Sequence, residues 1–533
     1  MAGALPSSEI DSIRRAPAAD GDGRTREGRA ASAATGLLVL LSFLFRLPPL
    51  LNARSTNSDA AVVGLQAIHL LQGERSAFLW GSGYQTSADA YVAAGFFALA
   101  GPTPLALMLS ALSLHVGATW LVFATLRRRL DPWTSLLASL PLVFAPSSIH
   151  TYALYPPRQL GITLAVAALW ALDGAAQRSR HPNAWLALGG LLYGLAISAD
   201  PYPLVLAPIV LVIGYGALGT APRPLARAPL LGAAVLAGLA PFALLHASAR
   251  GTSGPMGLTT SVLHRNWKLL VDECLPWALS YKVYYAHHVM DYLPWDAPVL
   301  VQAVQITGAL VAGALVAVGL GALFVRKVPL PIRRLGFAGA LAWPITIGGF
   351  LGSVMVMDLF SMRYLAVLTL MLPFASVPAA WMLGRTRFAV LIAPHLVASA
   401  LGGWVSYGPF VRGPVPVLET PELRDDYALL DLLRARRITY AEADYWASYR
   451  LTFLFREHVI VVPTNPTEDR YAPYRRAFEA APTFAYVFDP GRSREDIAEA
   501  EAQLVRTNAR VEKTHVGTLA VFLVTRGRVP ESP

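Results

Sequence analysis

Long hydrophobic segments recur along most of this chain, from Thr35 to Tyr407. Each has about 18 or more residues, which is enough for a helix to cross the roughly 30 Å of hydrocarbon in a bilayer. Hydrocarbon offers no hydrogen-bond partners, so a spanning segment of this kind pairs its backbone groups internally as an α-helix. Only 15% of the residues are charged and 54% are hydrophobic, whereas soluble domains have about 25% charged residues. The sequence predicts a polytopic α-helical membrane protein.

The spacing of the hydrophobic segments predicts eleven spans. They lie near residues 33–51, 105–126, 132–147, 159–176, 184–199, 203–219, 229–248, 298–325, 335–356, 364–383 and 388–406. Alternate connections carry the basic clusters Arg127-Arg128-Arg129, Arg178 with Arg180, Arg223 with Arg227, Arg326-Lys327 with Arg333-Arg334, and Arg385 with Arg387. Lys and Arg in short connections favour the cytoplasmic side of a plasma or inner membrane. We therefore expect a cytoplasmic N-terminus, and extracytoplasmic positions for the other connections and the C-terminal region.

The net charge of +10 is explained by the same clusters. In a soluble protein this excess would suggest nucleic acid as a partner, but in short connections between spans it sets topology instead. We expect membrane lipids and no nucleic acid as partners. The single cysteine, Cys274, excludes an intramolecular disulfide.

Three regions are expected along the chain. Residues 1–30 lack apolar periodicity and predict a disordered cytoplasmic tail. Residues 31–410 predict the transmembrane domain, with large outer loops at 52–104 and 250–296. Residues 411–533 have the composition of a soluble domain and are expected to form an extracytoplasmic α/β domain.

The first outer loop, 52–104, is too long and too regularly patterned to be a plain connector. Residues 60–71 predict an amphipathic helix with Ser58 or Asp59 as its N-cap, and residues 88–99 predict a second helix capped by Ser87. Two helices on the membrane surface are the expected result. Asp59, at the edge of the membrane after the first span, is costly enough there to suggest a functional role.

The second outer loop, 250–296, combines charged residues with many aromatic ones. Lys282 and His287 are candidates for covering a lipid or another molecule bound on the outer side. The pair His287-His288 invites interpretation as a metal site, but adjacent residues on a helix point about 100° apart. The sequence therefore predicts no metal site there.

The C-terminal region alternates helical and strand patterns. Helices are expected at 421–436, 444–455, 471–480 and 494–507, and strands at 438–441, 458–462, 484–488, 511–516 and 518–525. This alternation predicts a small, mostly parallel sheet closed by a hairpin. There is no Gly-rich phosphate loop, so nucleotide binding by this region is unsupported. An accessory role, or recognition of an acceptor molecule, is expected instead.

Several motifs follow one another in a characteristic order. They are Asn57-Ser58-Asp59, the run His69 to Glu74, Gly81-Ser82-Gly83-Tyr84 with Ser87 to Tyr91, the run Gly101 to Ala106, and Arg363-Tyr364-Leu365. In this order and topology the chain resembles the GT-C superfamily of polyprenyl-phosphate-dependent glycosyltransferases, and within it the branch of the protein O-mannosyltransferases and aminoarabinose transferases. The resemblance covers about the first 130 residues well, and the remaining spans by architecture.

The resemblance implies a polyprenyl-phosphate sugar as donor, a lipid, glycan or protein acceptor outside the cytoplasm, and inversion at the anomeric carbon. Asp59 is the candidate catalytic base, and its position beside lipid predicts a raised pKa. Arg363 and Arg158 are the candidates for binding the donor phosphate. Asp59 is followed by Ala60, where many relatives have a second acidic residue. No cofactor is therefore expected and a divalent metal is unsupported, while Asp89 is a candidate second carboxylate.

Each candidate also has a plainer interpretation. Asp59 and Asp89 suit helix N-terminal positions, and Arg363 and Arg158 suit positions at which arginines reach lipid headgroups. The aromatic group around Tyr445 suits the core of the soluble domain. The alternative functions are a transporter or flippase of lipid-linked sugars, and a non-catalytic membrane assembly protein. Against transport, the spans show no internal repeat, and the charged residues concentrate in the outer loops.

Overall fold

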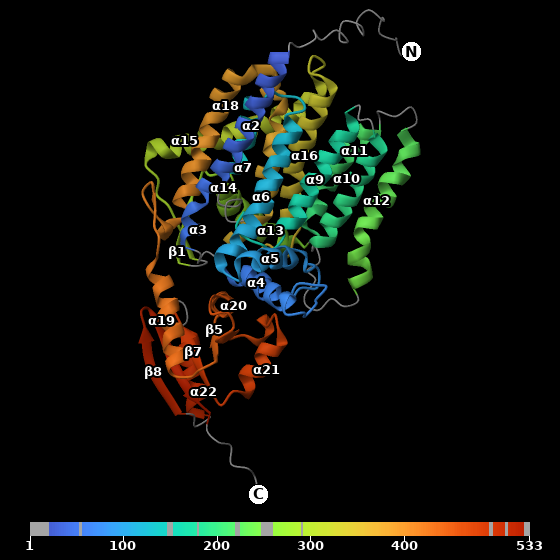
Figure 1. The fold of residues 1–533 in the computed structure, drawn as a ribbon. Helices are drawn as coiled ribbons and strands as arrows, with labels where there is room; N and C mark the ends of the chain where they lie inside the picture. The colour runs from blue at the N-terminus through green and yellow to red at the C-terminus, as the bar shows by residue number, and fades with distance from the viewer. Residues whose placement is uncertain are drawn as a thin grey trace, which may run out of the picture.

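A helical bundle and a smaller α/β domain make up the computed structural model (Figure 1). It describes residues 21–52, 56–145, 153–177, 181–218, 224–246, 259–288, 291–489, 494–506 and 510–526. The α/β domain lies against one end of the bundle, and the first described helix begins at the other end. The predicted fold class, a helical membrane domain followed by an α/β domain, agrees with this arrangement.

The bundle contains apolar helices of 6 to 29 residues. They are α2 (Gly21–Phe45), α3 (Leu47–Asn52), α6 (Pro104–Leu126), α7 (Pro132–Val143), α9 (Gln159–Ala176), α10 (Pro182–Ala199), α11 (Ala207–Leu218), α12 (Pro224–Leu245), α15 (Val299–Gly321), α16 (Leu330–Leu351), α17 (Ala366–Ala375) and α18 (Val377–Val405). Among the described residues, 7 helices are long and apolar enough to cross a membrane. The chain is a multi-pass integral membrane protein.

The predicted spans and the observed helices correspond closely, with two differences. Predicted spans 132–147, 184–199, 203–219 and 364–383 are not among the 7 qualifying helices, so the count of eleven stays a prediction. Helix α2 begins at Gly21, inside the segment predicted to be disordered; residues 1–20 lie outside the described part of the chain.

Helices α10 and α12 approach each other at backbone distance. A Cβ added to Gly194 would lie 2.2 Å from the carbonyl oxygen of Val235 and 2.8 Å from the Cα of Gly238. Lipid tails are as apolar as the helices, so close backbone packing at small residues is what holds such pairs together.

The outer loop 52–104 forms α4 (Ser58–Leu71) and α5 (Ala88–Ala100), which lie between the bundle and the α/β domain (Figure 1). The N-cap of α4 is Asn57, whose side chain accepts the N–H of Ala60 at 3.0 Å. The predicted caps Ser58 and Asp59 are therefore wrong. Ser87 precedes α5, but its hydroxyl donates to the carbonyl of Ser76 at 2.7 Å and does not cap the helix.

Helix α4 is buried along most of its length, from Ser58 to Ala67 apart from Asp59. The face in water that the amphipathic pattern predicted is therefore absent over this stretch. Gln66 donates to Phe78 and Ser87 of the loop that follows, and the hydroxyl of Ser58 accepts the N–H of Arg450 from the α/β domain.

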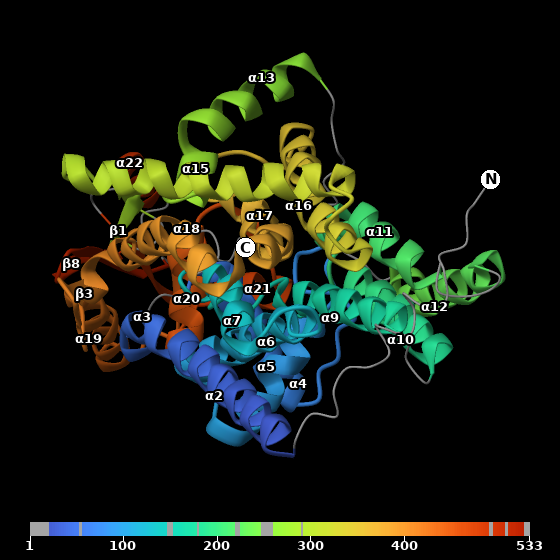
Figure 2. The same cartoon turned by 90° about the horizontal axis from the view of Figure 1, so that it is seen from above.

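The loop 259–296 contains α13 (Thr260–Leu269), α14 (Leu275–Ala278), and the hairpin β1 (Tyr284–His288) with β2 (Asp291–Pro294). Helix α13 lies at the periphery of the bundle, as the view from above shows (Figure 2). His287 and His288 lie in a strand, whereas the expectation that they bind no metal assumed a helix.

The α/β domain contains α19 (Pro421–Ala435), β5 (Tyr440–Ala443), α20 (Tyr445–Leu454), β6 (Ile460–Pro463), α21 (Ala472–Ala480), β7 (Thr483–Phe488), α22 (Arg494–Arg506), β8 (Arg510–Val516) and β9 (Leu519–Thr525). The sheet order is β6-β5-β7-β9-β8. Strand β5 is parallel to β6 and β7, whereas β9 is antiparallel to β7 and β8. The sheet is thus mixed and not mostly parallel, although the predicted closing hairpin, β8 with β9, is present.

The α/β domain docks on the outer loop through apolar and polar contacts. A Cβ at Gly64 of α4 would lie 2.7 Å from the ring of Phe453 in α20, and that ring stacks on Phe97 of α5 at 5.9 Å. Trp80 stacks on Tyr471 at 4.0 Å. The absence of a side chain at Gly64 lets the two helices approach, so the α/β domain is held close to the bundle.

His69 joins the two regions at the edge of this interface. Its Nδ1 lies 2.7 Å from Glu74 and its Nε2 lies 2.8 Å from Glu457 of the α/β domain. Tyr471 donates to Glu74 at 2.9 Å, and Tyr474 donates to Glu457 at 2.5 Å. We call His69, Glu74, Glu457, Tyr471 and Tyr474 the docking cluster.

The docking cluster predicts a pH-dependent stability of the whole protein. Burial lowers the pKa of His69, but Glu457 and Glu74 outweigh burial and hold that pKa above its ordinary value. Burial raises the pKa of Glu457, but His69 and Tyr474 outweigh it and hold that pKa below its ordinary value. Protonated His69 therefore stabilises the docked state at pH values below about 6.5, and this stabilisation is lost as pH rises through the raised pKa. Ionised Glu457 contributes above about pH 4.5 and is lost as pH falls.

We expect the thermal midpoint of unfolding to be highest between these two limits. His69→Gln should remove the alkaline fall and cost about 1 to 3 kcal/mol near pH 6. Thermal unfolding in detergent from pH 5 to 9 measures this. His458→Gln is the matched control, because His458 is an exposed histidine of the α/β domain outside the docking cluster. An unchanged pH profile in the His69 variant would contradict the assignment.

Candidate active site

A cavity of about 150 Å³ lies where the bundle meets the α/β domain. It is lined by Asp59, Val62, Leu79, Trp80, Gly81, Ser82, Tyr84, Gln85, Tyr155, Pro157, Arg158, Met355, Arg363, Tyr364, Tyr445 and Arg470. These residues come from α4, from the loop after it, from the turn before α9, from the segment before α17, and from the α/β domain. Five separate parts of the chain therefore build the site.

Asp59 lies in the first turn of α4, and its side chain points into the cavity because Asn57 takes the capping role. Tyr155 donates its hydroxyl to Oδ2 of Asp59 at 2.9 Å, and Tyr445 donates a short hydrogen bond to Oδ1. Arg470 lies 3.7 Å from Oδ1. The Asp59 side chain keeps 22% of its surface exposed. The plain capping interpretation of Asp59 therefore does not account for its position.

The neighbours of Asp59 change its acidity in the direction opposite to the prediction. Burial raises the pKa of the Asp59 carboxyl, but Arg470, Arg363 and the hydroxyls of Tyr445 and Tyr155 together outweigh burial and hold that pKa below its ordinary value. The predicted raised pKa is wrong for the empty site, because cations and hydroxyl donors stabilise the charged form more than burial destabilises it. Asp59 is an ionised proton acceptor at neutral pH.

Arg363 is the cation of the cavity that has no carboxylate partner among the described residues. It lies in the 3₁₀ turn Leu359–Leu365 that precedes α17, with its guanidinium 5.3 Å from the ring centroid of Tyr364. No described carboxylate lies within 4.0 Å of its nitrogens. Its guanidinium also forms a hydrogen bond with the side chain of Tyr364, so an anion in the cavity would meet the N–H groups that this bond leaves over.

Arg158 lines the same cavity, but its charge is already engaged. Its Nε lies 3.3 Å from Asp200, its guanidinium donates to the hydroxyl of Tyr84 at 3.2 Å, and it lies 5.3 Å from the centroid of Tyr364. Its backbone has φ of 75°, a strained value for a residue with a side chain. With this backbone conformation the side chain of Arg158 lines the cavity at the start of α9.

Asp89 does not line the cavity. Its two oxygens accept the backbone N–H groups of Arg158 at 3.0 Å and Leu160 at 2.9 Å, so it stabilises the first turn of α9 from a neighbouring helix. Burial raises the pKa of Asp89 to about 7, although those N–H groups oppose the shift. The geometry assigns Asp89 to positioning Arg158, in place of the catalytic role expected from the sequence.

The other candidates from the sequence also lie elsewhere. The Nζ of Lys282 donates to the carbonyl of Asp272 at 3.1 Å and lies 5.3 Å from the ring of Tyr284, and neither of these residues lines the cavity. His287 is in β1, and its side chain is outside the described part of the structure. Among the described residues no three His, Cys, Asp or Glu side chains gather as metal ligands would.

Two cavity residues that sequence reasoning missed come from the α/β domain. Arg470 donates to the hydroxyl of Tyr445 at 3.1 Å and to the carbonyl of Gly81 at 3.2 Å. Its own backbone N–H donates to Tyr449 at 2.5 Å. Tyr445 and Tyr449 were predicted to be core residues, and both are indeed buried, but Tyr445 also contacts Asp59. A lone Arg before a helix carries no signal that would single out Arg470 from the sequence.

Gly81 allows Arg470 to reach the cavity. Its φ is +68°, and a Cβ there would lie 2.4 Å from Cδ and 3.1 Å from Cα of Arg470. We expect Gly81→Ala to displace Arg470 and to lower the rate of the catalysed reaction about 100-fold, the effect of a misplacement near 1 Å.

Gly73→Ala is the matched control for this prediction. Gly73 has a φ of +97° with nothing within 4 Å of an added Cβ, so it imposes similar backbone strain without the clash. Initial rates of both purified variants measure the difference. Equal rates would show that backbone strain, and not the displacement of Arg470, is responsible.

Comparisons with known proteins agree with this picture. Residues 88–246 match the family described as dolichyl-phosphate-mannose-protein mannosyltransferase. No curated protein matches the chain. The fold is similar to that of ArnT from Cupriavidus metallidurans bound to undecaprenyl phosphate, with a TM-score of 0.55 and 12% identity over 94% of this chain and 99% of that one.

A second solved structure has a lower similarity. It is the Archaeoglobus fulgidus oligosaccharyltransferase in complex with Zn and sulfate, with a TM-score of 0.45 and 13% identity over 91% of this chain and 72% of that one. The family match over residues 88–246 and the fold shared with ArnT agree with the resemblance expected from the sequence.

Proposed function

We propose that the protein is a membrane glycosyltransferase that moves a sugar from a polyprenyl-phosphate donor to a lipid, glycan or protein acceptor outside the cytoplasm. The observation that carries the proposal is that Asp59 and Arg363, which has no described carboxylate within 4.0 Å, line one cavity. The match to a mannosyltransferase family and the fold shared with an ArnT that was crystallised with undecaprenyl phosphate support the donor class.

In the proposed reaction Asp59 accepts the proton of the acceptor hydroxyl or amine. The freed electron pair forms the new bond to the anomeric carbon, and the bond from that carbon to the phosphate oxygen breaks. The phosphate leaves with the electron pair, and Arg363 stabilises its charge through two guanidinium N–H groups. Attack opposite the departing phosphate inverts the anomeric centre.

Donor binding would also make Asp59 a better base. The pKa of Asp59 is held down in the empty site chiefly by Arg470 and Arg363. A phosphate bound at Arg363 adds negative charge nearby, which raises the pKa of the carboxylate. Proton abstraction would then be coupled to the presence of donor.

The position of the cavity supports an extracytoplasmic reaction. Arg158 precedes α9 at the end of the bundle that carries the cavity, whereas Arg128 and Arg129 contact Asp173 in the last turns of the same helix. If the basic clusters are cytoplasmic, as the distribution of Lys and Arg predicts, the cavity and the α/β domain face the other side.

Transfer by the purified protein in proteoliposomes tests the proposal. Several polyprenyl-phosphate sugars would be offered with lipid, glycan and peptide acceptors, with and without a chelator. We expect transfer from at least one donor, with an inverted product and no loss in chelator. Movement of the lipid-linked sugar across the bilayer without transfer would favour a flippase instead.

A further inference from the structure

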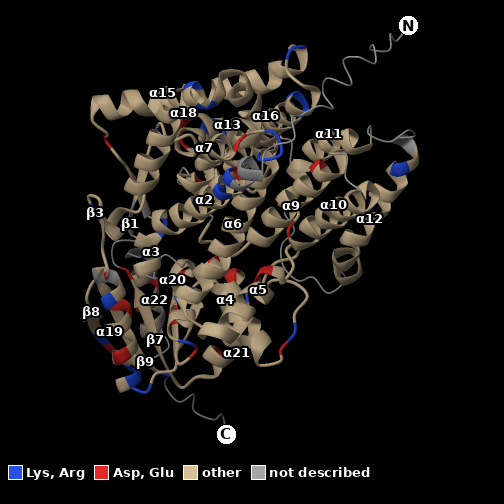
Figure 3. Ribbon diagram, turned by 45° about the horizontal axis from the view of Figure 1, so that its top comes forward, with Lys and Arg blue, Asp and Glu red and all other residues tan. Residues whose placement is uncertain are grey.

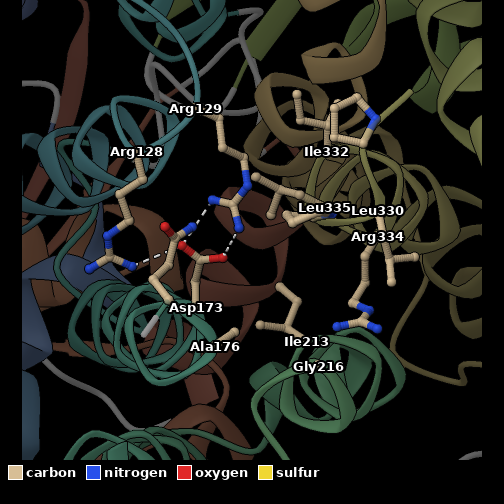
Figure 4. Close-up of a pocket in the computed structure, with 13 residues that line it drawn as sticks. Arg128, Arg129, Asp173, Ala176, Ile213, Gly216, Leu330, Ile332, Arg334 and Leu335 are labelled. Atoms are coloured by element: carbon tan, nitrogen blue, oxygen red, sulfur yellow. Dashed lines mark hydrogen bonds and ion pairs between the residues drawn. The ribbon is translucent and has the colours of Figure 1, made fainter. Parts of the chain in front are cut away.

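A second cavity lies at the opposite end of the bundle from Asp59, among α6, α9, α11 and α16 (Figure 4). Its volume is about 740 Å³. Helix α9 connects the two cavities, since it begins after Arg158 and has Asp173 in its last turns. Its 18 residues span about 27 Å at 1.5 Å per residue, so this cavity is separate from the candidate active site.

The cavity has more positive than negative charge. Arg128 and Arg129 both pair with Asp173, Arg128 at 2.9 Å and Arg129 through two contacts of which one is 3.0 Å. One carboxylate thus serves two guanidinium groups. With Arg334 also lining the cavity, three cations face one anion.

Arg334 has no described carboxylate within 4.0 Å. It lies across α11 beside Ile213 (Figure 4) and 6.0 Å from the ring centroid of Tyr215. A Cβ at Gly216 would lie 2.5 Å from its Nη1, so the absence of a side chain at Gly216 makes room for the guanidinium. The Arg129 side chain is only 6% exposed, and its Nε is buried without a hydrogen-bond partner.

Apart from Gln177, the rest of the wall is apolar. Ala176, Ile213, Leu330, Ile332 and Leu335 line the cavity, and Leu330 keeps 49% of its surface exposed. The basic clusters of the bundle gather at this end, near the N-terminus (Figure 3). A charged recess beside exposed apolar residues matches an amphiphile with an anionic head, and basic pockets between membrane helices on the cytoplasmic side bind such headgroups.

We propose that this cavity binds the phosphate group of an anionic membrane lipid, with Arg334 and Arg129 holding the phosphate and Leu330 and Ile213 contacting the chains. This lipid site is distinct from the proposed donor site at Arg363. The lipid bound here would therefore not be consumed in the transfer reaction.

Native mass spectrometry of the purified full-length chain with phosphatidylglycerol, phosphatidylcholine or inorganic phosphate tests it. We expect wild type to retain phosphatidylglycerol in preference to phosphatidylcholine. Arg334→Gln should weaken that retention about tenfold, since it removes a charge-assisted contact. Gly216→Ala should also weaken the retention of phosphatidylglycerol although Arg334 is still present, because the added methyl group would lie 2.5 Å from Nη1 of Arg334 and displace it.

Arg326→Gln is the matched control, because Arg326 is an exposed arginine at the same end and does not line the cavity. Its retention of phosphatidylglycerol should stay within twofold of wild type. Equal losses in the Arg326 and Arg334 variants would overturn the proposal, since they would reflect overall charge. Binding of inorganic phosphate without selective retention of phosphatidylglycerol would overturn the lipid assignment. The thermal midpoint of each variant shows whether it is folded.

Discussion

Replacing Asp59 by Asn is expected to lower the rate of sugar transfer roughly 10² to 10⁴-fold, the usual contribution of a general base, while donor binding is retained. The amide keeps the size of the carboxylate and an acceptor oxygen for the hydroxyl of Tyr445, so the cavity should keep its shape. It cannot take the proton of the acceptor. A transporter or an assembly protein would be little affected.

The measurement is single-turnover transfer with saturating donor, together with donor binding by the same sample. Asp272→Asn is the matched control, because Asp272 is an exposed carboxylate on the same side of the molecule that does not line the cavity. Asp59→Asn transferring at the wild-type rate would exclude Asp59 as the base.

The pH dependence of the wild-type rate follows from the same carboxylate. The base must be ionised, and the pKa of Asp59 in the empty site is held below its ordinary value by Arg470 and Arg363. The rate at limiting donor should therefore stay constant as pH falls from 7 to about 5. At saturating donor the fall should begin at a higher pH, because the bound phosphate raises that pKa.

Replacing Arg363 by Gln is expected to reduce transfer about 10² to 10³-fold, the usual cost of removing one charge-stabilising group. Donor affinity should fall as well, because no described carboxylate lies within 4.0 Å of Arg363 and only the more distant Asp59 acts on its charge. Arg363→Lys should recover part of the affinity but little of the rate, since a single ammonium does not hold two phosphate oxygens as a guanidinium does.

Arg158→Gln is the comparison variant for the Arg363 prediction. Arg158 shares the cavity, but its charge is engaged by Asp200 at 3.3 Å, so its loss should cost less than the loss of Arg363. Donor titrations and turnover of the three variants provide the ranking. A larger effect for Arg158 than for Arg363 would move the phosphate site to the start of α9.

Patterns that depend on neighbours in the sequence were predictable. The predicted spans 105–126 and 159–176 match α6 to within one residue and α9 at both ends, because the cost of burying a polar backbone in lipid acts on each segment alone. The elements of the α/β domain, such as β7 and α21, match their predicted ranges to within about two residues, as local periodicity allows. The N-cap of α4 was missed by one residue, because Asn, Ser and Asp cap equally well.

The chemistry of the site depends on contacts that no local pattern encodes. Tyr445 lies 386 residues from Asp59 in the sequence, yet its hydroxyl binds that carboxylate. Arg470 reaches the cavity only because Gly81 leaves room for it. Tyr445 and Arg470 help to lower the pKa of Asp59. Hydropathy could suggest only the effect of burial, which raises that pKa.

The sequence by itself determined that the chain crosses a membrane, that an acidic residue follows its first hydrophobic segment, and that a separate α/β region ends it, because these are properties of composition and short-range order. Tertiary structure alone decided which arginine is left without a carboxylate among the described residues, which carboxylate faces the cavity and which one supports a helix. It also decided that the α/β domain completes the cavity. The reason is that charge compensation is set by distances of a few ångströms between residues hundreds of positions apart.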